Sequence, residues 1–261
     1  MKHLFKVTIL TLAMLCCYTM ISEAKVKKTR KARTEKRITK TPSLSSKEIG
    51  SETMNDSQKT TNEREYVDLG LPSGTLWATM NVGANHPEDY GDYFAWGEIT
   101  TKDDFTWRSY RLGSGYNFLY KYCTSGVFAS GGKYDNKTEL DFVDDAAYKN
   151  WGKDWRIPSL AQIKELGREC SWQWTFKNGV NGYIITSNRN GNSIFLPAAG
   201  CRDECKLYNA GSVGQYWTRT LNEDFPNTAY LLVFGSSGSI GFKDISRYQG
   251  RSIRAVRMPH K

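Results

Sequence analysis

Four cysteine side chains are the most reactive groups in residues 66–261 of this chain. Cys123, Cys170, Cys201 and Cys205 allow three disulfide pairings. We favour a Cys123–Cys170 bridge, which would stabilise the fold by about 4 kcal/mol because it lowers the conformational entropy of the unfolded chain. We expect a second bridge, Cys201–Cys205, to close a short turn. Free buried thiols are the alternative. The sequence does not indicate a zinc site, because it has no Cys-x-x-Cys pair and only one histidine between residues 66 and 258.

Groups for hydrolytic catalysis are sparse and scattered. His86 stands alone in a turn-like segment, where a surface histidine is the ordinary case. No serine lies in a Gly-x-Ser-x-Gly elbow, and Gly113-Ser-Gly115 has no Gly-Lys-Ser/Thr continuation for binding phosphate. A carboxylate pair such as Glu88 with Glu98 suits glycoside hydrolysis only at a defined separation, which nothing in the sequence sets. We therefore expect a protein that is not an enzyme.

Acidic residues between 135 and 145 offer oxygen ligands of the kind that Ca²⁺ prefers. A structural calcium site is one reading of this group. Helix capping and turn hydrogen bonds are the other, and the one we favour. We expect no cofactor and no catalytic metal. The residues concerned are Asp135, Asn136, Asp141, Asp144 and Asp145.

The remaining chemistry is that of a binding surface. Residues 202–248 carry polar and aromatic side chains in glycine- and serine-rich loops between strands. Tyrosine and asparagine on rigidly supported loops suit adaptable recognition, and aromatic faces also stack on sugar rings. The alternative is that several of these aromatic residues belong to the core. The candidate binding residues are Arg202, Asp203, Tyr208, Asn222, Glu223, Asp224, Phe225, Asn227, Ser236, Ser237, Phe242, Asp244 and Tyr248.

Short strands and two short helices must position these side chains. Runs 182–187 and 193–196 flank Asn190-Gly191, a strong hairpin signal. Ser159 followed by Gln162 predicts a capping box for a short amphipathic helix, and Asp144-Asp145 predicts the start of a second helix. The pattern indicates an α+β fold of short antiparallel strands with long glycine-rich loops. The tryptophans at strands or strand–helix corners are expected in its core: Trp77, Trp96, Trp155 and Trp217.

The first 65 residues differ in composition from the rest. Residues 1–24 have a basic start, an apolar run and small residues at their end, as a secretory signal peptide does; an uncleaved anchor is the alternative. Cys16 and Cys17 are not preceded by small residues, so we favour a secreted, periplasmic or outer-surface protein over a lipoprotein. Residues 25–65 contain no aromatic side chain and many lysines, which predicts a disordered basic linker.

The net charge of +9 is mostly that of this linker. Residues 66–261 hold 22 Lys and Arg against 20 Asp and Glu, so the domain gives no reason to expect a nucleic-acid partner. The basic run in residues 25–40 is read as a solvated linker, and electrostatic contact with an anionic surface is its alternative role. About 195 residues suit a single domain spanning residues 66–261.

Several tryptophan- and glycine-containing phrases resemble one family. Residues 66–77 read YVDLGLPSGTLW, residues 87–98 PEDYGDYFAWGE, residues 155–158 WRIP and residues 191–200 GNSIFLPAAG. These phrases, spread over residues 66–258, resemble the Fibrobacter succinogenes major paralogous domain of secreted Bacteroides-group proteins. The resemblance implies a C-type-lectin-like fold, in which the first and last strands pair; here we expect residues 66–69 to pair with residues 253–256.

The resemblance supports architecture more than activity. The calcium loop of sugar-binding C-type lectins is altered at residues 223–227, and no cysteine follows Cys205, where the oxidase relatives of this fold need a reactive pair. The chain also departs from the family at residues 201–205, which read CRDEC. We therefore expect an exported non-catalytic module that binds glycan or protein at the bacterial cell surface. The alternatives are a structural subunit of a surface or fimbrial assembly, and an enzyme with an unrecognised site.

Overall fold

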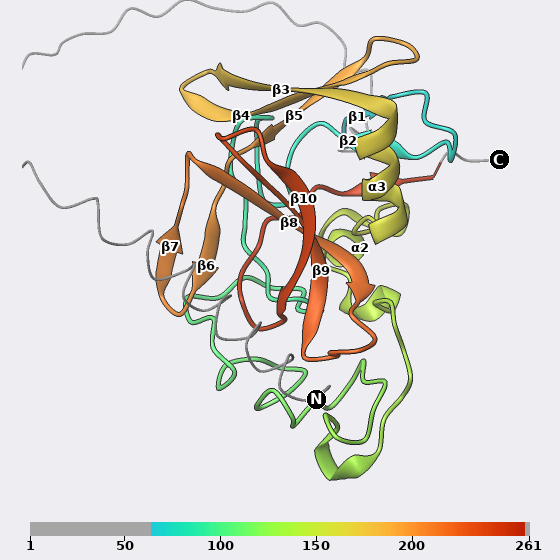
Figure 1. Ribbon diagram of the computed structural model, residues 1–261, viewed down its shortest axis with the longest axis vertical. Helices are drawn as coiled ribbons and strands as arrows, with labels where there is room; N and C mark the ends of the chain where they lie inside the picture. The colour runs from blue at the N-terminus through green and yellow to red at the C-terminus, as the bar shows by residue number, and fades with distance from the viewer. Residues whose placement is uncertain (1–63, 259–261) are drawn as a thin grey trace, which may run out of the picture. The chain divides into compact units, whose positions relative to one another are not determined.

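The structure is a computed structural model and describes residues 64–258. The expected signal peptide and nearly all of the expected linker lie outside this range. The described chain is an α+β arrangement of small antiparallel sheets with two α-helices (Figure 1). Its strands are β1 (Tyr66–Asp68), β2 (Leu76–Ala78), β3 (Cys170–Lys177), β4 (Val180–Ser187), β5 (Ser193–Pro197), β6 (Cys201–Asp203), β7 (Lys206–Tyr208), β8 (Val213–Leu221), β9 (Thr228–Gly235), β10 (Ile240–Ser246) and β11 (Val256–Arg257).

Both predicted helices are confirmed, together with their capping residues. Helix α2 (Ala146–Trp151) begins after Asp145, whose carboxylate accepts from the Tyr148 backbone N–H. Helix α3 (Leu160–Glu169) begins with the complete capping box of Ser159 and Gln162. These bonds satisfy N–H groups that a helix start leaves without partners. Two 3₁₀ turns, η2 (Ser130–Gly132) and η3 (Phe142–Asp144), precede α2.

The predicted hairpin around Asn190-Gly191 is also confirmed. Strands β4 and β5 pair antiparallel across it, and β3 pairs with the other side of β4. A second sheet has the order β10-β9-β8, and β6 pairs with β7. Helix α3 contacts β3, β8 and β9, so it lies where the β3-β4-β5 and β10-β9-β8 sheets approach each other.

The two ends of the described chain meet in one sheet, but they do not pair directly as expected. The order is β1-β2-β11: Val67 lies opposite Trp77, and Trp77 lies opposite Val256 on its other side. The buried strand β2 is therefore inserted between the terminal strands. Since all three residues of β2 are buried, it occupies the central position that β1, largely exposed, could not fill.

The long connection between β2 and α2 has little regular structure; its first part, teal in Figure 1, runs beside the sheets, and its later part, green, lies below them. Aromatic side chains hold it to the rest of the domain. The indole Nε1 of Trp96 donates to the Thr218 carbonyl, and that of Trp217 donates to the Phe94 carbonyl, each at 2.8 Å. All four tryptophans expected in the core are buried: Trp77, Trp96, Trp155 and Trp217.

Candidate functional site

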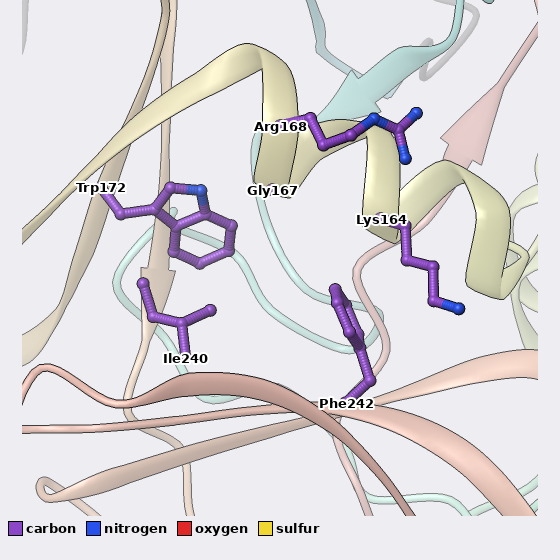
Figure 2. A pocket seen from close by; sticks show the side chains of 6 residues that line it. All are labelled: Lys164, Gly167, Arg168, Trp172, Ile240 and Phe242. Carbon is purple, nitrogen blue, oxygen red and sulfur yellow. The ribbon is translucent and has the colours of Figure 1, made fainter.

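A groove of about 440 Å³ opens between α3, β3 and β10 (Figure 2). Its volume lies within the range of roughly 300–1,000 Å³ that is usual for ligand pockets. Trp172 and Ile240 lie at one end, and Phe242 and Lys164 at the other, below the helix. The lining residues are Lys164, Gly167, Arg168, Trp172, Ile240 and Phe242.

The helical wall of the groove follows from the spacing of three residues on α3. Lys164, Gly167 and Arg168 have i, i+3, i+4 spacing and therefore share one face of the helix. The neighbouring face, which includes Ile163 and Leu166, is buried in the core. A Cβ atom at Gly167 would lie 3.9 Å from Cζ of Phe242. Because glycine has no side chain, space remains between the helix and the Phe242 ring at this position.

The floor of the groove is an extension of the hydrophobic core. Ile240 and Phe242 lie directly opposite Phe234 and Leu232 on β9, and directly opposite residues share a face of the sheet. Both β9 residues are buried, whereas Ile240 and Phe242 stay 38% and 39% exposed because β10 is an edge strand. Trp172 joins this surface, with its ring centroid 6.3 Å from that of Phe234.

The rim of the groove carries two cations without carboxylate partners. Neither Lys164 nor Arg168 takes part in any salt bridge within residues 64–258. The two acids nearest them in sequence are engaged elsewhere: Glu165 accepts from the backbone N–H and hydroxyl of Ser73, and Glu169 pairs with Arg189. Like charges four residues apart repel each other on a helix. An anion bound at this rim would remove that repulsion.

The candidate binding residues taken from the sequence do not form one surface. Phe242 lines the groove. Residues 222–227 connect β8 to β9, whereas residues 236–239 connect β9 to β10 at the opposite end of the same strands. The eight residues of β9 separate these turns by about 25 Å at the usual rise of a strand. Ser236 and Ser237 are therefore at one end of the sheet and Asn227 is at the other.

Asn222 was expected on the surface but is buried. Its side-chain oxygen accepts from the backbone N–H groups of Asp224 and Phe225, so it closes the turn rather than facing a ligand. Glu223, Asp224 and Phe225 at the tip are exposed.

Most of the other candidates already have partners within the domain. The Arg202 guanidinium lies 5.4 Å from the Tyr93 ring centroid, and Asp203 accepts from Gln249 at 2.6 Å. The ring of Tyr248 packs at 5.1 Å from that of Trp107. Asp244 accepts from the Thr228 hydroxyl, while Tyr208 is exposed on β7.

The expected disulfides are not found: all four described cysteines are free thiols. Cys123 and Cys170 belong to different clusters of the hydrophobic core. In the β6–β7 hairpin Cys201 lies opposite Tyr208, whereas Cys205 is exposed in the turn beyond the Asp203–Lys206 pair. The register thus separates the two residues. Burial raises the pKa of Cys170 to about 11 and also raises the pKa of Cys201, so both remain protonated near neutral pH.

The acidic residues between 135 and 145 are used in helix capping, turn hydrogen bonds and ion pairs with lysines. Asp135 accepts from the backbone N–H groups of Tyr122 and Cys123, and Asp145 caps α2 while pairing with Arg156 at 2.7 Å. Asp144 pairs with Lys121. Within residues 64–258 no group of three or more His, Cys, Asp or Glu side chains is arranged to hold a metal ion.

The two glutamates considered for hydrolysis have different surroundings. Glu98 is buried and pairs with Lys102, whereas Glu88 is half-buried and accepts from the Asn178 amide. His86 is exposed, with Nδ1 3.3 Å from the Asp89 carboxylate. Within residues 64–258 the hydrogen bonds of His86 all involve Asp89, and none involves a nucleophile.

Sequence reasoning missed the cationic rim of the groove. The available signal was Lys164 and Arg168 four residues apart on a helix predicted to be amphipathic, beside a glycine that weakens the helix.

Neither helix within residues 64–258 has the length and apolar character needed to cross a membrane. No family model matches the chain, and comparisons with curated proteins and with solved structures also find no match.

Proposed function

We propose that this chain is an exported, non-catalytic binding module with a variant of the C-type-lectin-like fold. Its ligand is a protein at the bacterial cell surface, and the groove between α3 and β10 holds a large apolar side chain of that ligand next to a carboxylate. The observation that carries this proposal is the combination of an exposed apolar floor with two cations at its rim that form no salt bridge among residues 64–258, one of which, Lys164, lies 5.9 Å from the Phe242 ring centroid. The family resemblance and the leader-like residues 1–24 support the fold and the exported location.

The groove favours protein over glycan because its lining is mainly apolar. Ile240, Phe242 and Trp172 offer an aliphatic and aromatic surface, whereas the charged groups are confined to the helix. Burying one large apolar side chain contributes about 1.5–3 kcal/mol. An exposed ion pair with Lys164 or Arg168 adds up to about 1 kcal/mol. The total of roughly 2–4 kcal/mol corresponds to millimolar binding or weaker, so the groove selects the ligand within a larger interface.

Nuclear magnetic resonance titration tests this proposal, because it detects binding at millimolar concentration. The probes are N-acetyl-Phe-Glu-amide and the matched N-acetyl-Phe-Gln-amide. We expect shifts in the amide signals of residues 164–172 and 240–242, with several-fold weaker binding of the Gln probe. Replacing Lys164 and Arg168 together by Gln should abolish the preference for Glu. Gly167→Leu should block both probes by filling the groove.

Lys149→Gln on α2 is the matched control, since it removes a lysine from another helix and should leave both titrations unchanged. The proposal fails if neither probe shifts the groove signals at about 100 mM, a concentration above the dissociation constants of about 1–35 mM that 2–4 kcal/mol implies. It also fails if the Gln probe binds as well as the Glu probe, because the cationic rim would then have no role.

A further inference from the structure

An aromatic loop, residues 112–122, exposes three large rings within five residues. The exposed fractions are 62% for Tyr116, 52% for Phe118 and 60% for Tyr120. Phe118 and Tyr120 flank Leu119, which is buried, so their side chains leave the extended backbone away from the core. None of the three rings contacts another ring among the described residues.

The backbone of this aromatic loop is firmly held. Gly113 and Leu119 form an antiparallel bridge, and Leu119 also forms a parallel bridge with Ala129. The backbone N–H of Leu119 donates to the Phe128 carbonyl at 2.9 Å, and the Leu119 carbonyl accepts from the Ser130 N–H at 2.8 Å. The rings therefore project from a tied hairpin, which lowers the conformational entropy that binding would cost.

One buried guanidinium closes the neck of the aromatic loop. Arg247 donates to the carbonyl oxygen of Leu112 at one end, at 3.4 Å, and to those of Lys121 and Tyr122 at the other end, at 3.0 and 2.7 Å. The Arg247 side chain is fully buried. The two ends of the loop are thus fixed to a single core residue.

Residues 112–122 carry a single charged side chain, and it is paired, although the exposed Arg111 directly precedes them. Lys121 is the only charged residue between positions 112 and 130. Its ammonium group pairs with Asp141 at 2.7 Å and with Asp144 at 2.5 Å. The groups left to meet a ligand are ring faces, the hydroxyls of Tyr116 and Tyr120, and the Asn117 amide.

We infer that the aromatic loop is a binding surface for a neutral polysaccharide. The faces of aromatic rings stack on the C–H faces of sugar rings, and hydroxyl and amide groups exchange hydrogen bonds with sugar hydroxyls. A nucleic-acid surface needs free cations to neutralise phosphates. A surface for anionic lipid needs basic residues beside the apolar ones. The single lysine of the loop is already neutralised, so the observations favour the uncharged ligand.

Affinity electrophoresis of the full-length protein tests this inference. Native gels contain laminarin, mannan, dextran or hydroxyethyl cellulose, which are all neutral. We expect retardation by at least one of them and an at least tenfold weaker effect for the triple variant Tyr116→Ala/Phe118→Ala/Tyr120→Ala. Phe176→Ala, which removes a ring 69% exposed on β3, should be retarded like the wild type. The Lys164→Gln/Arg168→Gln variant should also be retarded normally, which separates this inference from the groove.

Thermal unfolding of each variant shows whether the fold persists. If the triple variant unfolds, Tyr116→Ala alone replaces it, because this ring lies at the tip of the hairpin. Flotation with vesicles of phosphatidylcholine and phosphatidylglycerol runs in parallel. The inference is overturned if no gel retards the wild type, or if a folded variant is retarded equally. Flotation that needs the three rings, without retardation by any polysaccharide, would instead assign the loop to a lipid surface.

Discussion

Replacing Arg247 by Met removes a buried guanidinium but keeps most of the apolar stem. Four oxygens lie within 3.0 Å of its nitrogens: the Tyr110 hydroxyl and the carbonyls of Tyr122, Pro226 and Lys121. None of these partners is a carboxylate. The guanidinium acts as a multiple hydrogen-bond donor that joins loop segments rather than as half of an ion pair.

The expected loss of stability follows from these contacts. A buried acceptor left without its donor costs about 1–3 kcal/mol, so four acceptors cost roughly 4–12 kcal/mol. The variant no longer buries a charge, which recovers several kcal/mol. We expect a net loss of about 3–5 kcal/mol. For a domain of this size such a loss lowers the melting temperature by about 6–20 °C.

Calorimetry and hydrogen exchange measure the global and local parts of this effect. The Tyr120 N–H, which donates to the Leu112 carbonyl across the neck of the aromatic loop, should exchange much faster in Arg247→Met. Arg108→Met removes an exposed arginine and should change stability by less than about 0.5 kcal/mol. A melting temperature within about 2 °C of wild type, or unchanged Tyr120 exchange, would refute the proposed role of the guanidinium.

Two further substitutions probe the core and an ion pair. Trp217→Ala should lower the free energy of unfolding in urea by about 3–5 kcal/mol, because the ring is fully buried and its Nε1 donates to the Phe94 carbonyl. A loss below about 1 kcal/mol would contradict the assignment of Trp217 to the core. Hydrogen bonds from Lys121 and then Lys137 lower the pKa of Asp141 from 3.8 to about 2. A depressed carboxyl pKa stabilises the folded state above pH 4, and this contribution disappears as pH falls towards 2. Urea unfolding of wild type and Asp141→Asn should therefore differ at pH 5 and converge near pH 2, and an equal difference at both pH values would disprove the linkage.

Locally encoded features could be predicted from the sequence. The capping box of Ser159 and Gln162, the Asp145 cap and the Asn190-Gly191 hairpin each depend on residues only a few positions apart. The burial of the four tryptophans could also be predicted, because burying a large apolar ring is favourable, although Phe176 on β3, which is 69% exposed, shows that this expectation does not hold for every ring. These signals depend on local chemistry and require no knowledge of which strands meet.

Features that depend on long-range packing could not be predicted in the same way. The insertion of β2 between β1 and β11 depends on contacts between distant parts of the chain, and the residue pattern of the three strands does not show which one is central. The cysteine spacing left the hairpin register open, and that register places Cys201 opposite Tyr208. The groove could not be predicted from the sequence because it joins α3 to β10, which are about 75 residues apart. Of its lining residues, only Phe242 is a candidate binding residue on sequence grounds.

The least predictable feature is the burial of arginines near the C-terminus. Arg247, Arg251 and Arg254 are essentially inaccessible to solvent, although arginine is among the residues least often buried. For Arg247 a loop-rich domain explains this exception, because the carbonyl oxygens that it meets lie in loops and lack the ladder partners that strands provide. Arg254 donates to the backbone oxygens of Ala78, Thr79 and Phe195, just as Arg247 donates to those of the aromatic loop.

A guanidinium suits this task because it offers five N–H donors in one plane. Desolvation is the cost: burial lowers the pKa of Arg254 to about 10, which still leaves the group charged at neutral pH. By fixing both ends of the aromatic loop to the core, Arg247 allows Tyr116 and Tyr120 to be presented without regular secondary structure beneath them. Arg247 therefore fixes the position of the aromatic loop, whereas Tyr116, Phe118 and Tyr120 determine what its surface can bind. The exposed rings can be replaced without loss of the loop's position as long as Arg247 remains.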